Sequence, residues 1–283
     1  MKTALTHPQI LMLHQLGILP EHIRSIVGHP ALDKALQPGR MYKTLRLVLP
    51  QYGFTPGYPE TVLDRATQLF ARQQASGVRT LSFLDADYPQ ALLDIPDFPP
   101  LIHYLGDHTL FAQKGQVAVI GARKADRAGC EAAWKLGCKL GREHIVVSGL
   151  AAGCDTAAHR GCLDVGGRTV AIVATGLDTV FPCENEGLQA DILANGGAIL
   201  SEQPFGTPPA PKRLVARNRL QAALVDTVIV AQCPEHSGTL HTVEFARRYG
   251  KKIKAWRFAT PNEVNAGNFN LIGRGIAAPI ALN

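Results

Sequence analysis

The spacing of apolar residues divides the chain into two parts. Up to about residue 75, apolar residues recur three or four positions apart, first in ILMLHQLGI and then in EHIRSIVG, which follows Pro20. The segment PETVLDRATQLFARQQASG has the same spacing, with Pro59 at its start and Gly77 after its end. This period is typical of helices that bury one face, and proline and glycine commonly stand at helix boundaries. Residues 1–76 are therefore predicted to form a small all-α domain.

A proline-rich segment follows the helical part. VRTLSFLDADYPQALLDIPDFPPLIHYLGD contains Pro89, Pro96, Pro99 and Pro100. Proline and the residue before it disfavour helix, so this segment is expected to be largely extended and turn-like. We interpret residues 77–116 as a structured connector that leads into the second part of the chain.

From Val117 onward, short apolar runs alternate with longer helical segments. The runs are VAVIG, IVVSG, TVAIVATG, AILSE and TVIVAQ, followed by KKIKAW and by IAAPIAL as a candidate edge strand. Strands that alternate with helices of ten or more residues are typical of β-α-β units and a parallel sheet. The predicted fold class is α/β, with residues 117–283 forming a doubly wound, mostly parallel sheet.

Glycine, small hydroxyl residues and cations follow these runs. Ligands of open parallel sheets bind outside the carboxyl ends of the strands, so the loops there should line one crevice. Peptide N–H groups at helix starts and Ser or Thr hydroxyls donate to oxyanions, while Arg and Lys supply charge. We therefore predict an anion-binding crevice, although glycine and serine are also ordinary turn residues. The loops are Gly121–Lys124, Ser148–Gly153, Thr175–Asp178, SEQPFGTPPAPKRLVARNR and CPEHSGTLHT.

The charge distribution favours a polymeric ligand over a single small phosphate. The chain has 29 Lys and Arg against 23 Asp and Glu, a formal net charge of +6. Four cations and no acid lie between Glu202 and Asp226, and six cations and no acid lie between Glu244 and Glu263. Such windows could form a basic track for a phosphodiester backbone. A solvated face that keeps the protein soluble is the ordinary alternative for each window taken alone.

Several kinds of chemistry find no support in the sequence. A Walker-type G-x-x-x-x-G-K-[ST] loop is absent, and the six cysteines include no C-x-x-C pair, so no metal site is predicted. Ser148, Asp155 and His159 do not fit a catalytic triad: Asp155 and His159 stand on one predicted helix, with Asp155 interpreted as its N-cap. No signal peptide or membrane-spanning run is recognised. We expect a cytoplasmic protein that is not an enzyme and needs no cofactor.

The second part of the chain carries five motifs in a definite order. They are VAVIGARKADRAG, VVSGLAAGCDTAAHRGCLDVGGRTVAIVATGLDTVFPCENEGL, GGAILSEQPFGTPPAP, ARNRLQAALVDTVIVAQCPEHSGTLHT and GNFNLIGRG. Together with the preceding segment, about residues 80–280, they resemble the DNA-processing protein A family (DprA, also called Smf). The resemblance implies a Rossmann-like domain that binds single-stranded DNA without hydrolysing it. It also implies protection of single strands in natural transformation, loading of a RecA-type recombinase, and a homodimer.

The resemblance further implies roles for individual residues. Arg123, with Lys124 beside it, would meet a backbone phosphate, while Ser148 and Gly149 would line a loop. The RNR motif would hold the strand or form the pocket wall, and the SGT turn with Thr242 would bind an oxyanion. Lys212 and Arg213 extend the path by charge alone. The DNA-binding residues predicted in this way are Arg123, Lys124, Ser148, Gly149, Lys212, Arg213, Arg217, Asn218, Arg219, Ser237, Gly238, Thr239 and Thr242.

The chain departs from the family pattern at several places. Ala152 stands where the family usually has arginine, and Leu214, Val215 and Ala216 stand where Phe-Pro-Arg is usual. Two cations are therefore missing from the expected groove, which should weaken DNA binding and its salt dependence. The sequence also stops without the C-terminal winged-helix domain that some members carry, so it resembles a divergent member.

Two alternatives remain open at this point. SGTLHTVE, with Glu244, is similar to the lysine-decarboxylase-like phosphoribohydrolases, which would make the protein an enzyme or sensor for a nucleotide-like small molecule. Against this, His236 and Ser237 replace the glycine pair with which that motif starts. The other alternative is a mobile-element or defence protein that senses DNA with the same fold.

Overall fold

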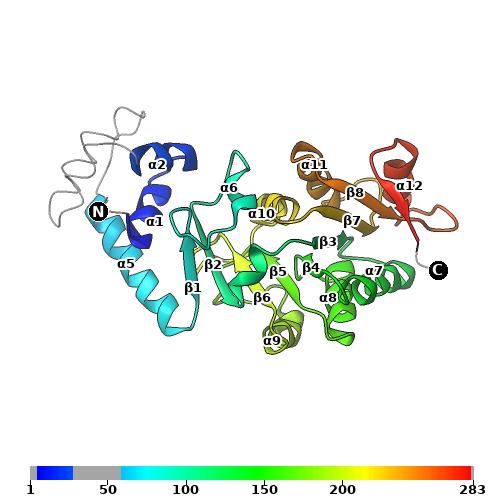
Figure 1. Cartoon of the computed structure of the whole chain (residues 1–283), viewed down its shortest axis with the longest axis horizontal. Helices are drawn as coiled ribbons and strands as arrows, with labels where there is room; N and C mark the ends of the chain where they lie inside the picture. The colour runs from blue at the N-terminus through cyan, green and yellow to red at the C-terminus, as the bar shows by residue number, and fades with distance from the viewer. Residues whose placement is uncertain (1–4, 28–58, 282–283) are drawn as a thin grey trace. The chain divides into compact units, whose positions relative to one another are not determined.

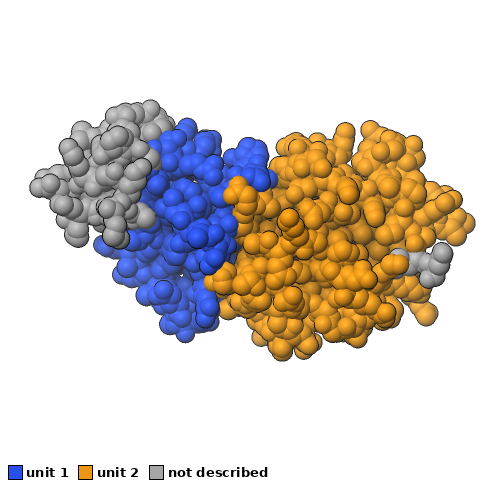
Figure 2. Space-filling view, viewed as in Figure 1, with its two compact units in different colours: residues 1–88, 93–103 blue, residues 89–92, 104–283 orange. Residues whose placement is uncertain are grey.

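A computed structural model describes residues 5–27 and 59–281 of the chain. The chain divides into two compact units, one of residues 1–88 and 93–103 and the other of residues 89–92 and 104–283 (Figure 2). All three boundaries between the units, after residues 88, 92 and 103, fall inside the segment interpreted as a connector. The division into residues 1–76, 77–116 and 117–283 stays a prediction.

The first unit contains the predicted helices. They are α1 (His7–Gln15), α2 (Pro20–Val27) and α5 (Pro59–Ala75), so helices are confirmed for all three apolar periodic segments. Ile10, Leu13 and Ile23 are fully buried, as their spacing requires. Before α1, the Gln9 side chain accepts a hydrogen bond from the Thr6 N–H at 2.8 Å, as in a capping box. The part of the predicted α-domain within 28–58 lies outside the described residues.

The segment interpreted as a connector contains two strands of the sheet. β1 (Arg79–Ser82) and β2 (Leu101–Gly106) are separated by the short helix α6 (Gln90–Leu93), and the 3-10 helix η2 (His108–Phe111) follows β2. The extended conformation was predicted, but the strands were not. Each strand occupies a run without proline, so its N–H groups are available for pairing even though the segment as a whole is proline-rich.

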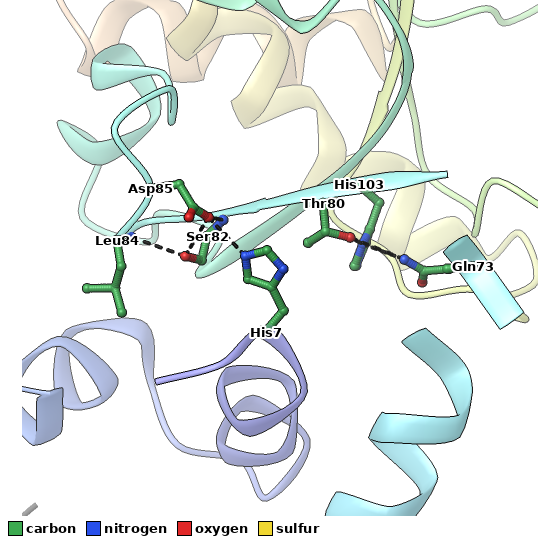
Figure 3. A network of polar contacts seen from close by, with 7 residues as sticks. All are labelled: His7, Gln73, Thr80, Ser82, Leu84, Asp85 and His103. Carbon is green, nitrogen blue, oxygen red and sulfur yellow. Dashed lines mark hydrogen bonds and ion pairs between the residues drawn. The ribbon is translucent and has the colours of Figure 1, made fainter. Parts of the chain in front are cut away.

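A polar network in the first unit joins α1 to the loop after β1 (Figure 3). The Asp85 carboxylate accepts hydrogen bonds from the Ser82 N–H at 2.6 Å and the Ser82 hydroxyl at 2.8 Å. The same oxygen lies 2.9 Å from Nε2 of His7, the first residue of α1. In the same network, Nδ1 of the buried His103 ring is hydrogen-bonded to the side chains of Gln73 and Thr80. Burial lowers the pKa of His103 to about 3. His103 is therefore a neutral hydrogen-bonding group at physiological pH.

The Asp85 contacts predict an acid-dependent contribution to stability. Partial burial raises the pKa of Asp85, but hydrogen bonds from Ser82 and the interaction with His7 outweigh it, so the pKa lies below its ordinary value of 3.8. A carboxyl whose pKa is lower in the folded state stabilises the fold above its unfolded pKa, and this contribution disappears as the pH falls through the folded pKa. Asp85→Ala should therefore lower the melting temperature at pH 7, and the difference from wild type should narrow as the pH falls below about 4. Thermal unfolding from pH 3 to 7 measures this. As a control at pH 7, Asp64→Ala, at an exposed site of α5, should leave the melting temperature close to that of wild type.

The second unit contains the predicted parallel strands. They are β3 (Gln116–Gly121), β4 (Ile145–Ser148), β5 (Thr169–Val173), β6 (Ala198–Ser201), β7 (Thr227–Gln232), β8 (Lys252–Trp256) and β9 (Ala278–Ile280). Among the described residues the sheet has nine strands in the order β1-β2-β6-β5-β4-β3-β7-β8-β9. The strand pairs from β6 through β9 are parallel. The α/β fold class and the edge strand after Ile276 are confirmed.

The chain order creates a switch point beside β3. After β3 the strands add in one direction through β6, and then β7 pairs with the other side of β3. Loops leaving β3 and β7 at their carboxyl ends therefore diverge and leave a crevice there. Helices α7 (Arg127–Leu140), α8 (Cys154–Asp164) and α9 (Glu186–Ala194) lie on one side of the sheet, and α10 (Pro211–Leu224) and α11 (Thr239–Arg248) lie on the other (Figure 1). α12 (Ala266–Gly273) follows β8.

Close packing of α7 and α8 completes one layer. Buried side chains of β3, β4 and β7 pack against both helices, including Val119, Val146 and Ile229. A Cβ at Gly137 would collide with the Ala158 carbonyl, and one at Gly161 would collide with the Trp134 carbonyl, so these glycines let the two helices approach. The described part of the chain has no helix with both the length and the apolar character needed to cross a bilayer.

Candidate functional site

A cavity of about 470 Å³ lies at the switch point, lined by the carboxyl end of β3, the loop that follows it and the loop after β7. Its size is that of an ordinary ligand pocket. Asp155 and the start of α10 complete the wall. Eight of the thirteen predicted site residues line this cavity, namely Arg123, Lys124, Arg217, Asn218, Ser237, Gly238, Thr239 and Thr242. The structure thus brings together residues that are up to about 120 positions apart in the sequence, as expected for loops at one sheet edge.

Arg123 and Lys124 are the exposed cations of this cavity. Both lie between β3 and α7, and both side chains are open to solvent. No hydrogen bond or ion pair of either side chain is found within residues 5–27 and 59–281. Their charges therefore remain available to an anionic ligand, at the place where the sheet topology directs ligands.

The turn before α11 forms the opposite wall. The helix dipole places partial positive charge at the start of α11, where Thr239 and Thr242 line the cavity. A Cβ at Gly238 would meet nothing within 4 Å, so a ligand can approach the backbone closely. The Asn218 side chain donates to the Gly238 carbonyl at 3.4 Å and links α10 to this turn.

The expectation of free peptide donors in these loops requires a correction. The Thr239 N–H donates to the Ser237 hydroxyl at 3.2 Å, and the His241 N–H donates to the Gly238 carbonyl at 3.2 Å. In the loop after β4, the Gly149 N–H donates to Asp155 at 3.0 Å. These N–H groups are satisfied within the protein, so the site attracts anions through side-chain charge, hydroxyl groups and the dipole of α11.

Arg217 lines the cavity, but its guanidinium is committed to the protein. The residue is 3% exposed, and Nη1 donates to the carbonyls of Gly149 (2.8 Å) and Ile172. The carboxylate of Asp155, itself 6% exposed, supplies the opposing charge. Burial raises the pKa of Asp155 against the effect of Arg217, and burial lowers the pKa of Arg217 to about 10. Arg217 thus belongs to the pocket wall, and it holds the loop after β4 against α10.

Arg219 does not line the cavity, which corrects its prediction as a DNA-binding residue. Its Nη1 and Nη2 donate to the two carboxylate oxygens of Glu202 at 2.7 and 2.6 Å. Both side chains are largely buried. A bidentate pair of this kind uses the charge of the guanidinium internally.

The remaining predicted residues also lie outside the main cavity. Ser148 is fully buried and donates to the Val119 carbonyl at 2.7 Å, so it supports the sheet and cannot meet a ligand there. Gly149 lines a smaller cavity of about 90 Å³, together with Ala152 and Phe181. Lys212 is exposed on the first turn of α10, and Arg213 donates to the Pro208 carbonyl at 2.9 Å. Lys212 and Arg213, the two residues predicted from their charge alone, therefore do not line the main cavity.

Asp155 is the site residue whose role was missed. The N-cap interpretation is wrong, because Gly153 is the N-cap of α8 and Asp155 lies in the first turn. Its carboxylate instead accepts from the loop after β4, as described above. The signal in the sequence was a carboxylate just after a glycine-rich loop, but its partner Arg217 is 62 residues further along. His159 lies 2.7 Å from the Thr169 hydroxyl, so these residues do not connect as a Ser-His-Asp triad.

Comparison with known proteins agrees with this site. The sequence profile of the family described as DNA recombination-mediator protein A matches residues 79–282. Protein Smf of Synechocystis sp. is 36% identical over 224 residues, which are 76% of this chain and 55% of that protein. DNA processing protein DprA of Streptococcus pneumoniae is 39% identical over 188 residues, 66% of this chain and 64% of that protein. The chain thus spans about half to two thirds of the length of these relatives.

Solved structures show the same similarity. An X-ray structure of DNA processing protein A from Streptococcus pneumoniae aligns with a TM-score of 0.81 and 31% identity, covering 98% of this chain and 95% of that chain. A structure of DNA processing protein A from Helicobacter pylori aligns with a TM-score of 0.65 and 29% identity, covering 72% of this chain and 91% of that chain. The study of the Helicobacter pylori protein concerns its single-stranded DNA binding mode.

Proposed function

Because the chain belongs to the DNA recombination-mediator protein A family, we propose that it binds single-stranded DNA through backbone phosphates, with little sequence preference. The observation that carries this proposal is the switch-point cavity, with Arg123 and Lys124 exposed at its rim and the start of α11 opposite them. Cations beside a positive helix end suit a phosphodiester, and they give no means of reading base sequence. In this proposal the protein binds DNA without hydrolysing it and needs no cofactor.

The proposal extends to a role in recombination. A protein that covers single-stranded DNA without altering it would protect the strand and could assist loading of a RecA-type recombinase, as in DNA uptake and natural transformation. We propose a cytoplasmic homodimer for this role. The family match supports a role in recombination, and the Helicobacter pylori structure supports binding of single-stranded DNA.

Titration of a labelled oligo-dT at several salt concentrations tests the binding proposal. The affinity should fall steeply with salt, because bound phosphates release counterions. Nucleoside monophosphates, titrated beside the oligonucleotide, should bind far more weakly because each offers a single phosphate. Tight monophosphate binding, or release of a free base, without oligonucleotide binding would contradict the proposal and favour the small-molecule alternative.

The geometry does not strengthen the phosphoribohydrolase alternative. Glu244, the acid on which it depends, is not among the residues that line the cavity. Its carboxylate is exposed and lies 3.3 Å from Arg247 and 3.6 Å from Arg248, on the surface of α11. An acid placed there is not directed at the ligand that the cavity would hold.

A further inference from the structure

One residue anchors both ends of the loop that carries the exposed cations. Gln232, the last residue of β7, is fully buried. Its backbone carbonyl accepts from the Ala122 N–H at 2.8 Å, just before Arg123. Its side-chain oxygen accepts from the Asp126 N–H at 3.1 Å, and its side-chain nitrogen donates to the Asp126 carboxylate at 2.8 Å. Arg123 and Lys124 lie between these two anchors.

Surrounding features show that this arrangement is closely fitted. Asp126 is the N-cap of α7, and its Oδ1 also accepts from the Gly129 N–H at 2.8 Å. A Cβ at Gly129 would collide with the Gln232 amide, so the glycine makes room for it. The register between β3 and β7 shifts at Gly121, which pairs with Gln232. Such irregularities commonly redirect the chain next to functional sites.

We propose that Gln232 is a positioning residue that sets the place of Arg123 and Lys124 at the cavity rim. The proposal rests on the function proposed above. A glutamine is required because the side chain must accept from a backbone N–H and donate to a carboxylate at the same time. Leucine can do neither, and glutamate can only accept. We call the two hydrogen bonds between the Gln232 side chain and Asp126 the clamp. Without the clamp, the two cations remain charged but lose their fixed position relative to the phosphates of the bound strand.

A pair of buried glutamine variants separates positioning from stability. Gln116 is also buried and hydrogen-bonded, and it lies at the amino end of β3, at the opposite edge of the sheet from the cavity. Gln232→Leu and Gln116→Leu should both lower the melting temperature. Only Gln232→Leu should weaken oligo-dT binding and flatten its salt dependence, by up to about 1.4 units of slope for two single-strand phosphate contacts. Equal DNA-binding losses in the two variants would overturn the proposal.

Role reversal provides a second test. Gln232→Glu alone sets two carboxylates against each other and should weaken DNA binding. Adding Asp126→Asn removes the repulsion between the two carboxylates. Because Oδ1 of Asp126 meets both Gln232 and the Gly129 N–H, the amide introduced at position 126 can donate to the new carboxylate only by giving up the bond from Gly129, so the recovery is expected to be partial. Oligo-dT affinity should then recover toward wild type. No recovery by this double variant, with the fold intact by circular dichroism, would count against the clamp.

Two measurements distinguish failure of this proposal from failure of the proposed function. In Gln232→Leu, removing both rim cations should cost little further affinity; a full additional loss would overturn positioning. Amide hydrogen exchange of residues 122–126, measured without DNA, should accelerate in Gln232→Leu and not in Gln116→Leu. Unchanged exchange would overturn the clamp even if DNA binds as proposed. Accelerated exchange in Gln232→Leu, combined with no DNA binding by the wild-type protein, would support the clamp and contradict the proposed function.

Discussion

Replacing Arg217 with methionine is expected to reduce the free energy of unfolding by about 3–5 kcal/mol. The Asp155 carboxylate would remain buried without its opposing charge, and the carbonyls of Gly149 and Ile172 would lose a donor. Urea unfolding followed by circular dichroism measures the loss. A cost below about 1 kcal/mol, as at ordinary surface positions, would contradict the buried arrangement.

Two comparisons make this result specific. Lys212→Met removes an exposed cation from the same helix and should change the free energy of unfolding by no more than about 0.5 kcal/mol. Combining Arg217→Met with Asp155→Asn should recover part of the loss, because the uncompensated charge is then gone. Loss of DNA binding by an Arg217 variant would accordingly report on folding of the site.

Replacing Arg123 and Lys124 together with alanine should lower oligo-dT affinity and reduce the salt slope by about 1.4 units, since each single-strand phosphate contact contributes about 0.7. Both side chains are exposed and lie at the cavity, so stability should stay within about 0.5 kcal/mol of wild type. Fluorescence anisotropy across a range of salt concentrations provides the slope.

Arg247→Ala with Arg248→Ala is the matched control for this experiment. It removes the same net charge from the last turn of α11, outside the cavity lining. The salt slope should stay near the wild-type value. Equal reductions of the salt slope in both double variants would indicate that DNA binding depends only on the overall charge of the protein. An unchanged salt slope in Arg123→Ala with Lys124→Ala would exclude these residues as phosphate contacts.

These experiments distinguish an exposed arginine at the cavity from buried arginines, which the sequence alone does not tell apart. Arg123, Arg217 and Arg219 all lie at loops or helices near the carboxyl edge of the sheet, and all were predicted as DNA-binding residues, with Arg217 and Arg219 holding the strand or forming the pocket wall. Arg123 is solvent-exposed, while Arg217 is buried and donates to backbone carbonyls and Arg219 is buried and paired with Glu202. The cationic surface of the cavity is therefore smaller than the count of basic residues suggested.

Local pattern was sufficient for most of the secondary structure. Runs such as VAVIG and TVIVAQ became β3 and β7, because parallel strands buried on both faces consist of short continuous apolar runs rich in β-branched residues. β1 and β2 were missed because the prolines around them obscured two short runs that can pair. The position of the cavity also followed from local pattern, since the loops after parallel strands must meet at one edge.

The state of each side chain at that edge depended on contacts between distant segments. Nothing within the RNR motif reveals that the charge of Arg217 interacts with Asp155 or that Arg219 pairs with Glu202, because Asp155 lies on α8 and Glu202 follows β6, far from the motif in the sequence. The same holds for Gln232, whose partner Asp126 lies 106 residues earlier in the chain. The spacing of apolar residues predicts which face of a helix or strand is buried, and it depends only on residues close together in the sequence. Burial, charge pairing and hydrogen-bond partners arise only when the crossovers bring separate strands together, so they emerge with the packed fold.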